Sequence, residues 1–402
     1  MPDLKVKIGL IGKFDMLKFK NMKKVREQAI QAAPAKEVKG EFAINNNAKA
    51  LHPDYVTLIV DEIIDHGAAN AKTFVFKSKD GKALPYFRAG MYLSLKLNID
   101  GSLVTRAYSL CSSPKKALQG KYAIAVRSNP KGFVADKLLA ELKVGDEVIS
   151  SCPQGQFYYE DLRDCPSVIA VAGGAGITPF LSMAEAIADG TEDFNLTVIF
   201  NSRTEDNILF KKELDAICAA TDKVKVVHVL SREEKEGYEN GHITAELIKK
   251  YAPEDYSVYI CGPEKMYKSV LAEVKKLGVA DRKIRHEALG VTNTVWEEPG
   301  YPVECKDKVF ELTVKQGEAE YKIPCAANEP ILVAIERAGI KAPSRCRAGE
   351  CGWCRSKLVS GTFFVPEENE MRRWADKEHG YIHPCATFAT SDMVLEVPGE
   401  FF

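Results

Sequence analysis

The sequence predicts a multidomain fold: an antiparallel β-barrel, then a doubly wound α/β domain, then a smaller α+β domain. Three observations predict this order. Short alternating strands separated by turn clusters begin at residue 54. Strand–helix alternation replaces them near residue 161, and short strands return after Gly300. The predicted boundaries are 1–50 for a basic N-terminal extension and linker, 51–160 for the barrel, 161–300 for the α/β domain and 301–402 for the last domain.

Each domain is predicted from its own elements. The barrel strands are expected at 56–60, 74–76, 92–97, 107–110 and 122–126. The α/β domain is expected to have strands at 167–172, 196–200, 224–230 and 258–261, with helices at 179–188, 207–219, 244–250 and 264–277. The last domain is expected to have strands at 310–314, 321–323 and 357–359, with a helix at 330–338.

The N-terminal extension is strongly basic. Residues 1–36 carry nine Lys or Arg against three acids, a net charge of +6. Apolar residues recur at helical spacing (Leu10, Phe14, Leu17, Met22 and Val25), which predicts a basic amphipathic helix. We favour an arm that packs on a neighbouring domain over one that contacts a partner protein or a membrane surface. Asn45-Asn46-Asn47 and Pro53 are typical of a linker.

Composition restricts the class of protein. A net charge of −1 with 46% hydrophobic and 28% charged residues is ordinary for a globular protein and gives no basic excess for nucleic acid. Eleven cysteines without paired spacing outside one loop, and no signal peptide, predict a cytoplasmic location. The longest uncharged stretch, 165–184, contains glycines and a proline, so no membrane-spanning helix is predicted.

Four cysteines near the C-terminus have the spacing of a metal site. Cys346, Cys351 and Cys354 share one loop, and Cys385 follows thirty residues later. This is the plant-type ligand spacing for a [2Fe–2S] cluster, whereas zinc ligands usually come as two close pairs. Gly349 and Gly352 would let backbone N–H groups reach the sulfurs. The loop therefore predicts a carrier of single electrons.

A glycine-rich turn opens the α/β domain. Gly173, Gly174 and Gly176 follow an apolar strand, Thr178 is a candidate helix cap, and Pro179 suits the first helical turn. Free N–H groups at such a helix start can bind a pyrophosphate, although similar turns also serve packing. Cys261-Gly262-Pro263 ends a later strand, where open α/β sheets bind their ligands.

One barrel strand carries a third candidate site. In Arg106-Ala107-Tyr108-Ser109, Arg106 and Tyr108 share a face of the strand. The cation suits a phosphate, the ring can stack on a planar heterocycle, and the Ser109 hydroxyl can bond a ring nitrogen. Taken alone, the pattern is also compatible with an ordinary barrel wall.

Together these three sites, in this order, resemble the ferredoxin–NADP reductase superfamily, and more closely its phthalate dioxygenase reductase type, over about residues 54–400. The resemblance implies a flavin-binding barrel, a nucleotide domain and a β-grasp ferredoxin domain. It implies FAD, with FMN as the alternative, NADH, with NADPH as the alternative, and a [2Fe–2S] cluster.

The resemblance also implies residue roles. Tyr108 would stack on the isoalloxazine, Ser109 would lie near flavin N5, Arg106 would meet the flavin phosphate, and Glu287 would lie near the flavin. Cys261 would lie near the nicotinamide, and Gly173, Gly174, Gly176 and Thr178 would hold the pyrophosphate. A second phosphate loop is implied at Gly132, Val134 and Ala135, where Ala135 replaces the usual serine. The catalytic set is then Tyr108, Ser109, Cys261 and Glu287, and the remaining cofactor-binding residues are Arg203, Ser231, Arg232, Gly262 and Pro263.

The choice of nucleotide depends on charges after two strands. Arg203, Ser231 and Arg232 lie where the adenosine ribose is expected, and a cation there could pair with a 2′-phosphate. Four acids beside them would repel that phosphate (Glu205, Asp206, Glu233 and Glu234). We therefore favour NADH.

The predicted activity is an NAD(P)H:acceptor reductase. Electrons would pass from NAD(P)H to the flavin, then to the cluster, and then to a partner metalloprotein such as an oxygenase. The alternative is an electron-transfer subunit of a larger complex, possibly running toward NAD⁺ reduction. Lysines and arginines outnumber Glu350 around the cluster and predict a basic docking face for an acidic partner (Lys341, Arg345, Arg347, Arg355 and Lys357). A solvated rim that raises the cluster potential is the competing interpretation.

Overall fold

The computed structural model describes residues 22, 24–29, 31–32, 42–99, 101–129, 134–287 and 290–399. The chain divides into two compact units, residues 1–50 and 51–402. In the first unit the described residues among 22–32 are helical, and Met22 and Val25 are exposed. The other apolar residues of the predicted amphipathic helix, at positions 10, 14 and 17, lie outside the described residues.

The segment read as an irregular linker is in fact helical. Helix α2 (Ala43–Leu51) contains all three asparagines, and none of its residues is buried. Ala43, Ala48 and Ala50 have high helix propensity, which outweighs the turn preference of the asparagines. This part of the linker prediction was wrong in its local structure.

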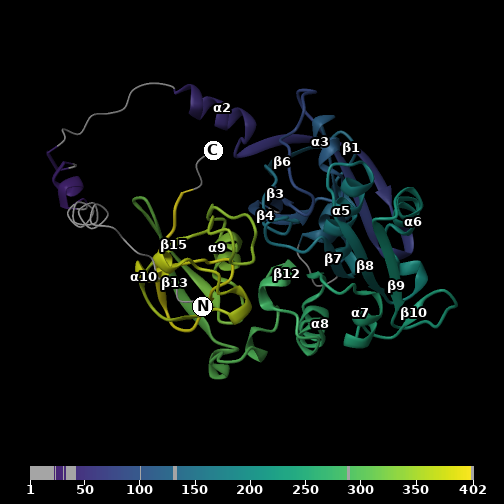
Figure 1. Cartoon of the computed structure of the whole chain (residues 1–402). Coiled ribbons are helices and arrows are strands. Elements are labelled where there is room, and N and C mark those ends of the chain that lie inside the picture. Colours follow the sequence, from purple (N-terminus) through teal and green to yellow (C-terminus); the bar gives the residue numbers. More distant parts are fainter. Residues whose placement is uncertain are drawn as a thin grey trace, which may run out of the picture. The chain divides into compact units, whose positions relative to one another are not determined.

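The first domain of the second unit is an antiparallel sheet that closes on itself (Figure 1). Its strands are β1 (Tyr55–Asp65), β2 (Ala71–Ser78), β3 (Tyr92–Ile99), β4 (Ser102–Ser109), β5 (Lys121–Arg127) and β6 (Glu147–Ser151), in the order β4-β3-β6-β1-β2-β5. A bridge between Leu110 and Ile124 brings the two end strands together. Alternate side chains such as Phe74, Phe76 and Leu93 fill the interior. The predicted barrel is confirmed. Strand β6 and the short helices α3 (Pro114–Leu118) and α4 (Ala135–Glu141) were not predicted.

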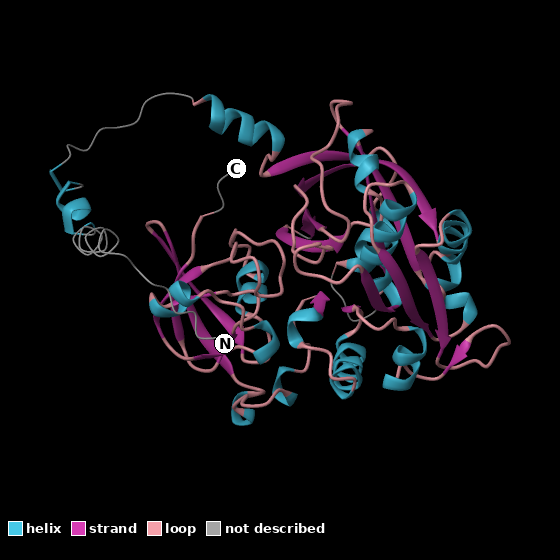
Figure 2. Cartoon of the chain, viewed as in Figure 1, coloured by secondary structure: helices cyan, strands magenta, loops and turns pink. Residues whose placement is uncertain are grey.

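The second domain is a parallel sheet with helices on both faces, as Figure 2 shows. The strand order is β10-β9-β8-β7-β11-β12. The strands are β7 (Ser167–Gly173), β8 (Asn195–Ser202), β9 (Val224–Leu230), β10 (Glu239–Asn240), β11 (Ser257–Cys261) and β12 (Ile284–Glu287). The helices are α5 (Thr178–Ala188), α6 (Lys211–Ala220), α7 (Ala245–Tyr251) and α8 (Glu264–Lys276).

Strand β7 separates the two cores of this sheet. Its residues 168, 170 and 172 pack toward α5 and α6, and residues 169 and 171 pack toward α7 and α8. The doubly wound prediction is therefore confirmed. Helix α6 begins four residues later than expected, because residues 205–207 form a short 3₁₀ turn and Phe210 has a left-handed backbone (φ 61°).

The third domain is a small mixed sheet covered by one helix. The sheet order is β14-β13-β19-β15-β17, and β13 runs parallel to β19. The elements are β13 (Val309–Gln316), β14 (Ala319–Ala326), α9 (Ile331–Arg337), β15 (Ser356–Ser360), β17 (Tyr381–Ile382) and β19 (Met393–Glu396), with a separate pair β16 (Phe363–Phe364) and β18 (Phe388–Ala389) and the helix α10 (Trp374–Glu378). Leu312, Ile335 and Leu395 lie in its core. The α+β prediction is confirmed.

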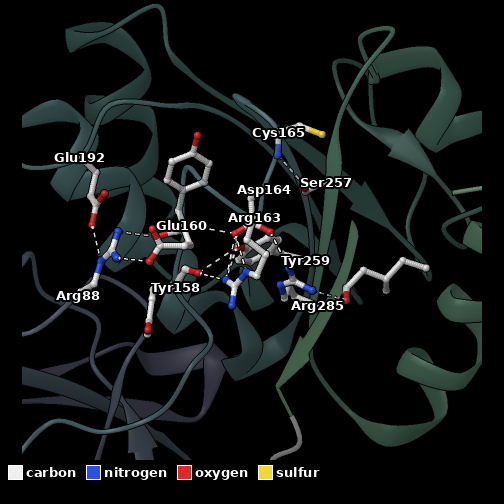
Figure 3. Close-up of polar contacts among 12 residues, drawn as sticks. Arg88, Tyr158, Glu160, Arg163, Asp164, Cys165, Glu192, Ser257, Tyr259 and Arg285 are labelled. Carbon is white, nitrogen blue, oxygen red and sulfur yellow. Dashed lines mark hydrogen bonds and ion pairs between the residues drawn. The ribbon is translucent and has the colours of Figure 1, made fainter. Parts of the chain in front are cut away.

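A buried carboxylate joins the first two domains (Figure 3). The Asp164 side chain accepts hydrogen bonds from the Tyr259 hydroxyl (2.8 Å) and from Arg163 (3.0 Å). Its other oxygen lies 3.1 Å from the guanidinium of Arg285 on β12, and the backbone N–H of Glu160 also donates to it. Because this one side chain bonds the connecting segment, β11 and β12, it fixes where the carboxyl end of β12 lies.

Candidate nucleotide, flavin and cluster sites

A cavity of about 880 Å³ lies at the carboxyl ends of the parallel strands. All three domains line it. The barrel contributes residues 127–129, and the α/β domain contributes the glycine turn, Gly262 and Pro263. The third domain contributes Pro366, Glu368 and Asn369. A cavity at the point where the strand order reverses, between β7 and β11, is where doubly wound sheets bind ligands.

The glycine turn forms one wall of this cavity as a 3₁₀ turn, Gly174–Ile177. Gly174 has φ +56°, and a Cβ at Gly176 would overlap the carbonyl oxygen of Cys261. The turn can therefore approach β11 only because it lacks side chains. Pro179 lies in the first turn of α5, as predicted. The Thr178 hydroxyl donates to the carbonyl of Ala175 (2.8 Å) and does not cap the helix, so that part of the prediction was wrong.

Two arginines face this turn, and the sequence analysis missed one of them. The guanidinium of Arg127, at the end of β5, lies only 2.7 Å from where a Cβ on Gly174 would be. Burial, together with the neighbouring Arg203, lowers the pKa of Arg127. Two like charges at one cavity wall suit an anion such as a pyrophosphate. No motif marks Arg127 in the sequence, because only the barrel's packing brings it to the turn.

The loops after β8 and β9 form the next part of the site. Ser202 and Arg203 line the cavity. Ser231 and Arg232 do not, but their N–H groups donate to the carbonyls of Ser202 (3.0 Å) and Arg203 (2.9 Å). The structure thus brings together the residues predicted around the adenosine ribose.

The acids beside these loops already have partners. The Glu205 carboxylate pairs with Lys235 and accepts a hydrogen bond from the Tyr238 hydroxyl. The Lys235 hydrogen bond is the first cause that lowers the pKa of Glu205. The carboxylate of Glu233 accepts the N–H of Glu205 at 2.8 Å. Repulsion of a 2′-phosphate by Glu205 is consequently weaker than its charge alone suggests.

The strand predicted to bind flavin lies against the cluster loop. Ala107 of β4 packs in a cluster with Tyr92, Cys346 and Ala348. Burial raises the pKa of Tyr108 to about 12. Burial and the nearby Arg347 lower the pKa of Arg106 to about 10. Neither Arg106 nor Tyr108 lines the 880 Å³ cavity, and Ser109 ends the same strand as a buried residue.

Of the predicted second phosphate loop, Gly132 lies outside the described residues. Val134 is buried immediately before α4, and Ala135 is the first residue of that helix. These two residues are therefore placed at a helix start, where backbone N–H groups are free of intrahelical partners.

The ends of β11 and β12 place two predicted catalytic residues differently. The Cys261 thiol is buried, which raises its pKa, and Cys261 does not line the cavity. Glu287 lines it, and burial followed by the charges of Glu350 and Cys346 raises the pKa of its carboxyl group. Its Oε2 has no hydrogen-bond partner among the described residues. A buried carboxyl oxygen without a partner fits a bound heterocycle such as a flavin, with which it can share a hydrogen bond.

The cluster loop holds its sulfurs through backbone N–H groups. Those of Ala348 and Cys351 donate to the Cys346 sulfur, and that of Trp353 donates to Cys351, each at 3.4 Å. Gly349 (φ +85°) and Gly352 (φ +69°) have the left-handed backbone that the wrapping requires, as predicted. The ring Nδ1 of His383 lies 2.6 Å from the Gly349 carbonyl and must carry a hydrogen, because a carbonyl only accepts.

The four thiols are arranged in pairs. Hydrogen bonds from Cys351 and then Cys385 lower the pKa of Cys346, and Cys385 also interacts with Cys354. Among the described residues no three Cys, His, Asp or Glu side chains converge as ligands of a single ion. A [2Fe–2S] cluster needs two thiolates on each iron, so the pairing fits the cluster better than a lone zinc.

Comparisons with known proteins agree with these sites. Three family models match in order: an oxidoreductase FAD-binding domain over residues 57–159, an oxidoreductase NAD-binding domain over 170–271 and a 2Fe-2S iron-sulfur cluster binding domain over 314–390. The glycine betaine monooxygenase reductase subunit of Chromohalobacter salexigens is 26% identical over 81% of this chain and 91% of its own length. NADH-cytochrome b5 reductase 1 of Mortierella alpina is 30% identical over 55% of this chain and 74% of its own length.

A solved structure shares the whole domain order. Phthalate dioxygenase reductase, titled a modular structure for electron transfer from pyridine nucleotides to [2Fe–2S], superposes with a TM-score of 0.60 and 25% identity. The match covers 86% of this chain and 98% of that one.

Fold and sites thus define a flavin- and iron–sulfur-dependent NAD(P)H reductase. The chain belongs to the ferredoxin–NADP reductase superfamily, and within it to the phthalate dioxygenase reductase type. Its cofactors are FAD, NADH and a [2Fe–2S] cluster, and it passes electrons from the nucleotide through flavin and cluster to a protein acceptor. Within the described ranges, no helix combines the length and apolar character needed to cross a membrane.

Proposed function

We propose that this reductase delivers single electrons to an oxygenase in the cytoplasm. The observation that carries the proposal is the packing of the cluster loop on β4, where Ala107 contacts Cys346 and Ala348. Because the two predicted redox sites share this interface, a flavin on β4 would lie close to the cluster. The relatives named as reductase subunits of a monooxygenase support the choice of an oxygenase.

We assign the nucleotide to the 880 Å³ cavity. Arg127 and Arg203 supply the charge for the pyrophosphate, and the turn at Gly173, Gly174, Gly176 and Thr178 supplies the close backbone approach. Ser231 and Arg232 support the adenosine end through their bonds to the preceding loop. Gly262 and Pro263 line the part of the cavity near Glu287, and Cys261 supports them from beneath.

We assign the flavin to β4 and the start of α4. Tyr108 and Ser109 would orient the ring, and Arg106 would pair with the phosphate, helped by backbone N–H groups at Gly132, Val134 and Ala135. When bound, the flavin accepts two electrons from NADH and releases them one at a time. Glu287, whose raised pKa favours the protonated form, holds a proton beside that ring.

The structure narrows the proposed docking face. Arg345 is buried, with its guanidinium 3.4 Å from the centre of the Trp353 ring, and Arg347 pairs with Glu336. Neither is available to a partner protein. Arg355 and Lys357 remain at the surface beside the cluster, and they would meet an acidic partner.

The test is an anaerobic NADH titration of the reconstituted protein, followed by visible absorption and EPR. We expect bleaching of the flavin and a rhombic signal from the reduced cluster. Flavin reduction with an oxidised, intact cluster would overturn the internal pathway. Repeating the titration with NADPH measures the nucleotide preference.

The second candidate function is a subunit fixed in a larger redox complex, possibly reducing NAD⁺. The basic N-terminal extension favours it, because helix α2 has no buried residue and exposes Phe42 and Ile44 at its start. Gel filtration of the full chain and of a chain without residues 1–45, each with the isolated acceptor, separates the two. A stable complex lost with the extension would favour the second candidate.

A further inference from the structure

The third domain contributes a wall to the cavity that we assign to the nucleotide. The short 3₁₀ turn Glu367–Asn369 follows Pro366, and residues 366, 368 and 369 all line the cavity. Glu368 is half-buried there and lies near Glu298 and Lys268 of the second domain's side. A ligand that fills the cavity would therefore contact the iron–sulfur domain directly.

Asn369 connects this wall to the two other domains' loops. Its side chain is only 7% exposed. The amide nitrogen donates to the Ala348 carbonyl (3.0 Å) in the cluster loop and to the Gly290 carbonyl (3.3 Å) at the cavity. Both N–H groups of one buried amide are thus used to bridge the cavity and the cluster loop.

The contact with the cluster loop is too close for a side chain. A Cβ at Gly349 would lie 2.5 Å from the backbone oxygen of Asn369. The adjacent Ala348 N–H donates to the Cys346 sulfur (3.4 Å). Since packed contacts of this kind transmit displacement, a shift of Asn369 changes the position of Ala348 and hence that hydrogen bond.

We propose that Asn369 is a positioning residue that couples occupancy of the nucleotide cavity to the electronic environment of the cluster. Hydrogen bonds to cluster sulfurs are among the factors that set reduction potentials. A nucleotide bound against the 366–369 wall therefore changes the cluster potential, and by reciprocity the reduction state of the cluster changes nucleotide affinity. The inference rests on the assignment of the cavity to the nucleotide.

The experiment measures the cluster midpoint potential by EPR-monitored anaerobic titration of the full protein. It is done with and without saturating 1,4,5,6-tetrahydro-NAD, an NADH analogue that cannot donate hydride. We expect a shift equivalent to at least a threefold affinity ratio, which is about 28 mV because tenfold corresponds to about 59 mV for one electron. No shift in the unaltered protein would overturn the coupling.

Two variants locate the effect. Asn369→Ala removes both hydrogen bonds, and we expect the analogue to bind the oxidised protein with unchanged affinity while the potential shift disappears. Glu367→Gln changes an exposed residue of the same turn that does not line the cavity, and the shift should remain. An Asn369→Ala protein with the full shift would contradict the role of Asn369.

The unaltered protein supplies a check that does not depend on the variant folding. The analogue's dissociation constant, measured before and after cluster reduction, must differ by the ratio that the potential shift gives. Equal constants would overturn the proposal. NADH reduction of flavin and cluster is recorded in parallel: if it succeeds while no shift is found, only the coupling fails, and if it fails, the proposed function fails.

Discussion

The cluster loop and the nucleotide turn use the same backbone chemistry for opposite purposes. Both depend on glycines that let N–H groups approach an acceptor. In the cluster loop the acceptors are the chain's own sulfurs, and the N–H groups of Ala348, Cys351 and Trp353 are already bonded to them. In the nucleotide turn the acceptor would arrive from solution, and the turn borders an open cavity with Arg127 and Arg203 beside it.

This difference indicates how each site should fail. The cluster loop is buried and its parts act together, so loss of one thiol removes the bound group. The nucleotide turn adds several independent contacts to a diffusible ligand, so each loss should reduce affinity by a limited factor. The variants below test this contrast, beginning with the largest expected effect.

Replacement of a cluster cysteine should abolish electron delivery without affecting flavin reduction. Cys351 is the most exposed of the four thiols, so Cys351→Ala disturbs packing least. We expect the reduced-cluster EPR signal to vanish while stopped-flow bleaching of the flavin by NADH keeps its rate. Cys325→Ala, at a buried cysteine of the same domain's core, is the matched control and should keep the signal. An intact signal in Cys351→Ala would exclude this ligand set.

A matched pair of glycine variants should separate the two sites. Gly349→Ala requires a left-handed backbone and places a Cβ 2.5 Å from the oxygen of Asn369, a strain of about 1–3 kcal/mol before the clash. We expect it to lose most of its cluster. Gly176→Ala overlaps the Cys261 carbonyl, and it should weaken NADH binding by roughly 10- to 100-fold while the cluster spectrum remains. Iron content and NADH affinity measure the two outcomes, and a crossed result would refute the separation.

The sequence predicted the parts of these sites that are local. The cysteine spacing, the positive φ of Gly349 and Gly352, and the turn after β7 each depend on neighbours within a few residues. The fold classes of all three domains were predicted because alternation and strand–helix order persist over many residues. The Asn45–Asn47 prediction failed because the flanking alanines decide that segment.

Residues that depend on contacts between domains could not be found from sequence. Arg127 and Asn369 carry no motif, and each acquires its place only when the barrel or the third domain packs beside the cavity. The basic docking prediction counted Arg345 and Arg347 as surface charges, but they are used inside the protein, by Trp353 and Glu336 respectively. Sequence counts charge, and packing decides which charges are exposed. The residue roles at the flavin remain predictions.

Removal of Arg127 should weaken nucleotide binding by a limited factor. A hydrogen bond to a charged group contributes about 1.5–3 kcal/mol, so Arg127→Gln should raise the dissociation constant for NADH roughly 10- to 100-fold. Lys121→Gln at the other end of β5, where the lysine pairs with Asp61, is the matched control and should leave the constant unchanged. Fluorescence titration measures both. If Arg127→Gln binds NADH normally, the pyrophosphate does not lie at this wall.

The smallest effect is expected at the docking face, where charges are solvated. Lys357→Gln keeps a hydrogen-bond donor near the His379 carbonyl but removes one cation beside the cluster loop. An exposed charge contributes at most about 1 kcal/mol to such an encounter, so the rate of acceptor reduction at low salt should fall only about two- to fivefold. The difference should disappear near 0.5 M salt, where the Debye length is only about 4 Å. Lys322→Gln on β14, whose lysine pairs with Glu311, gives the comparison for a charge elsewhere on the same domain. Equal losses for the two variants would mean that the partner responds to total charge and does not dock at this face, whereas a loss confined to Lys357→Gln places the acceptor beside the cluster.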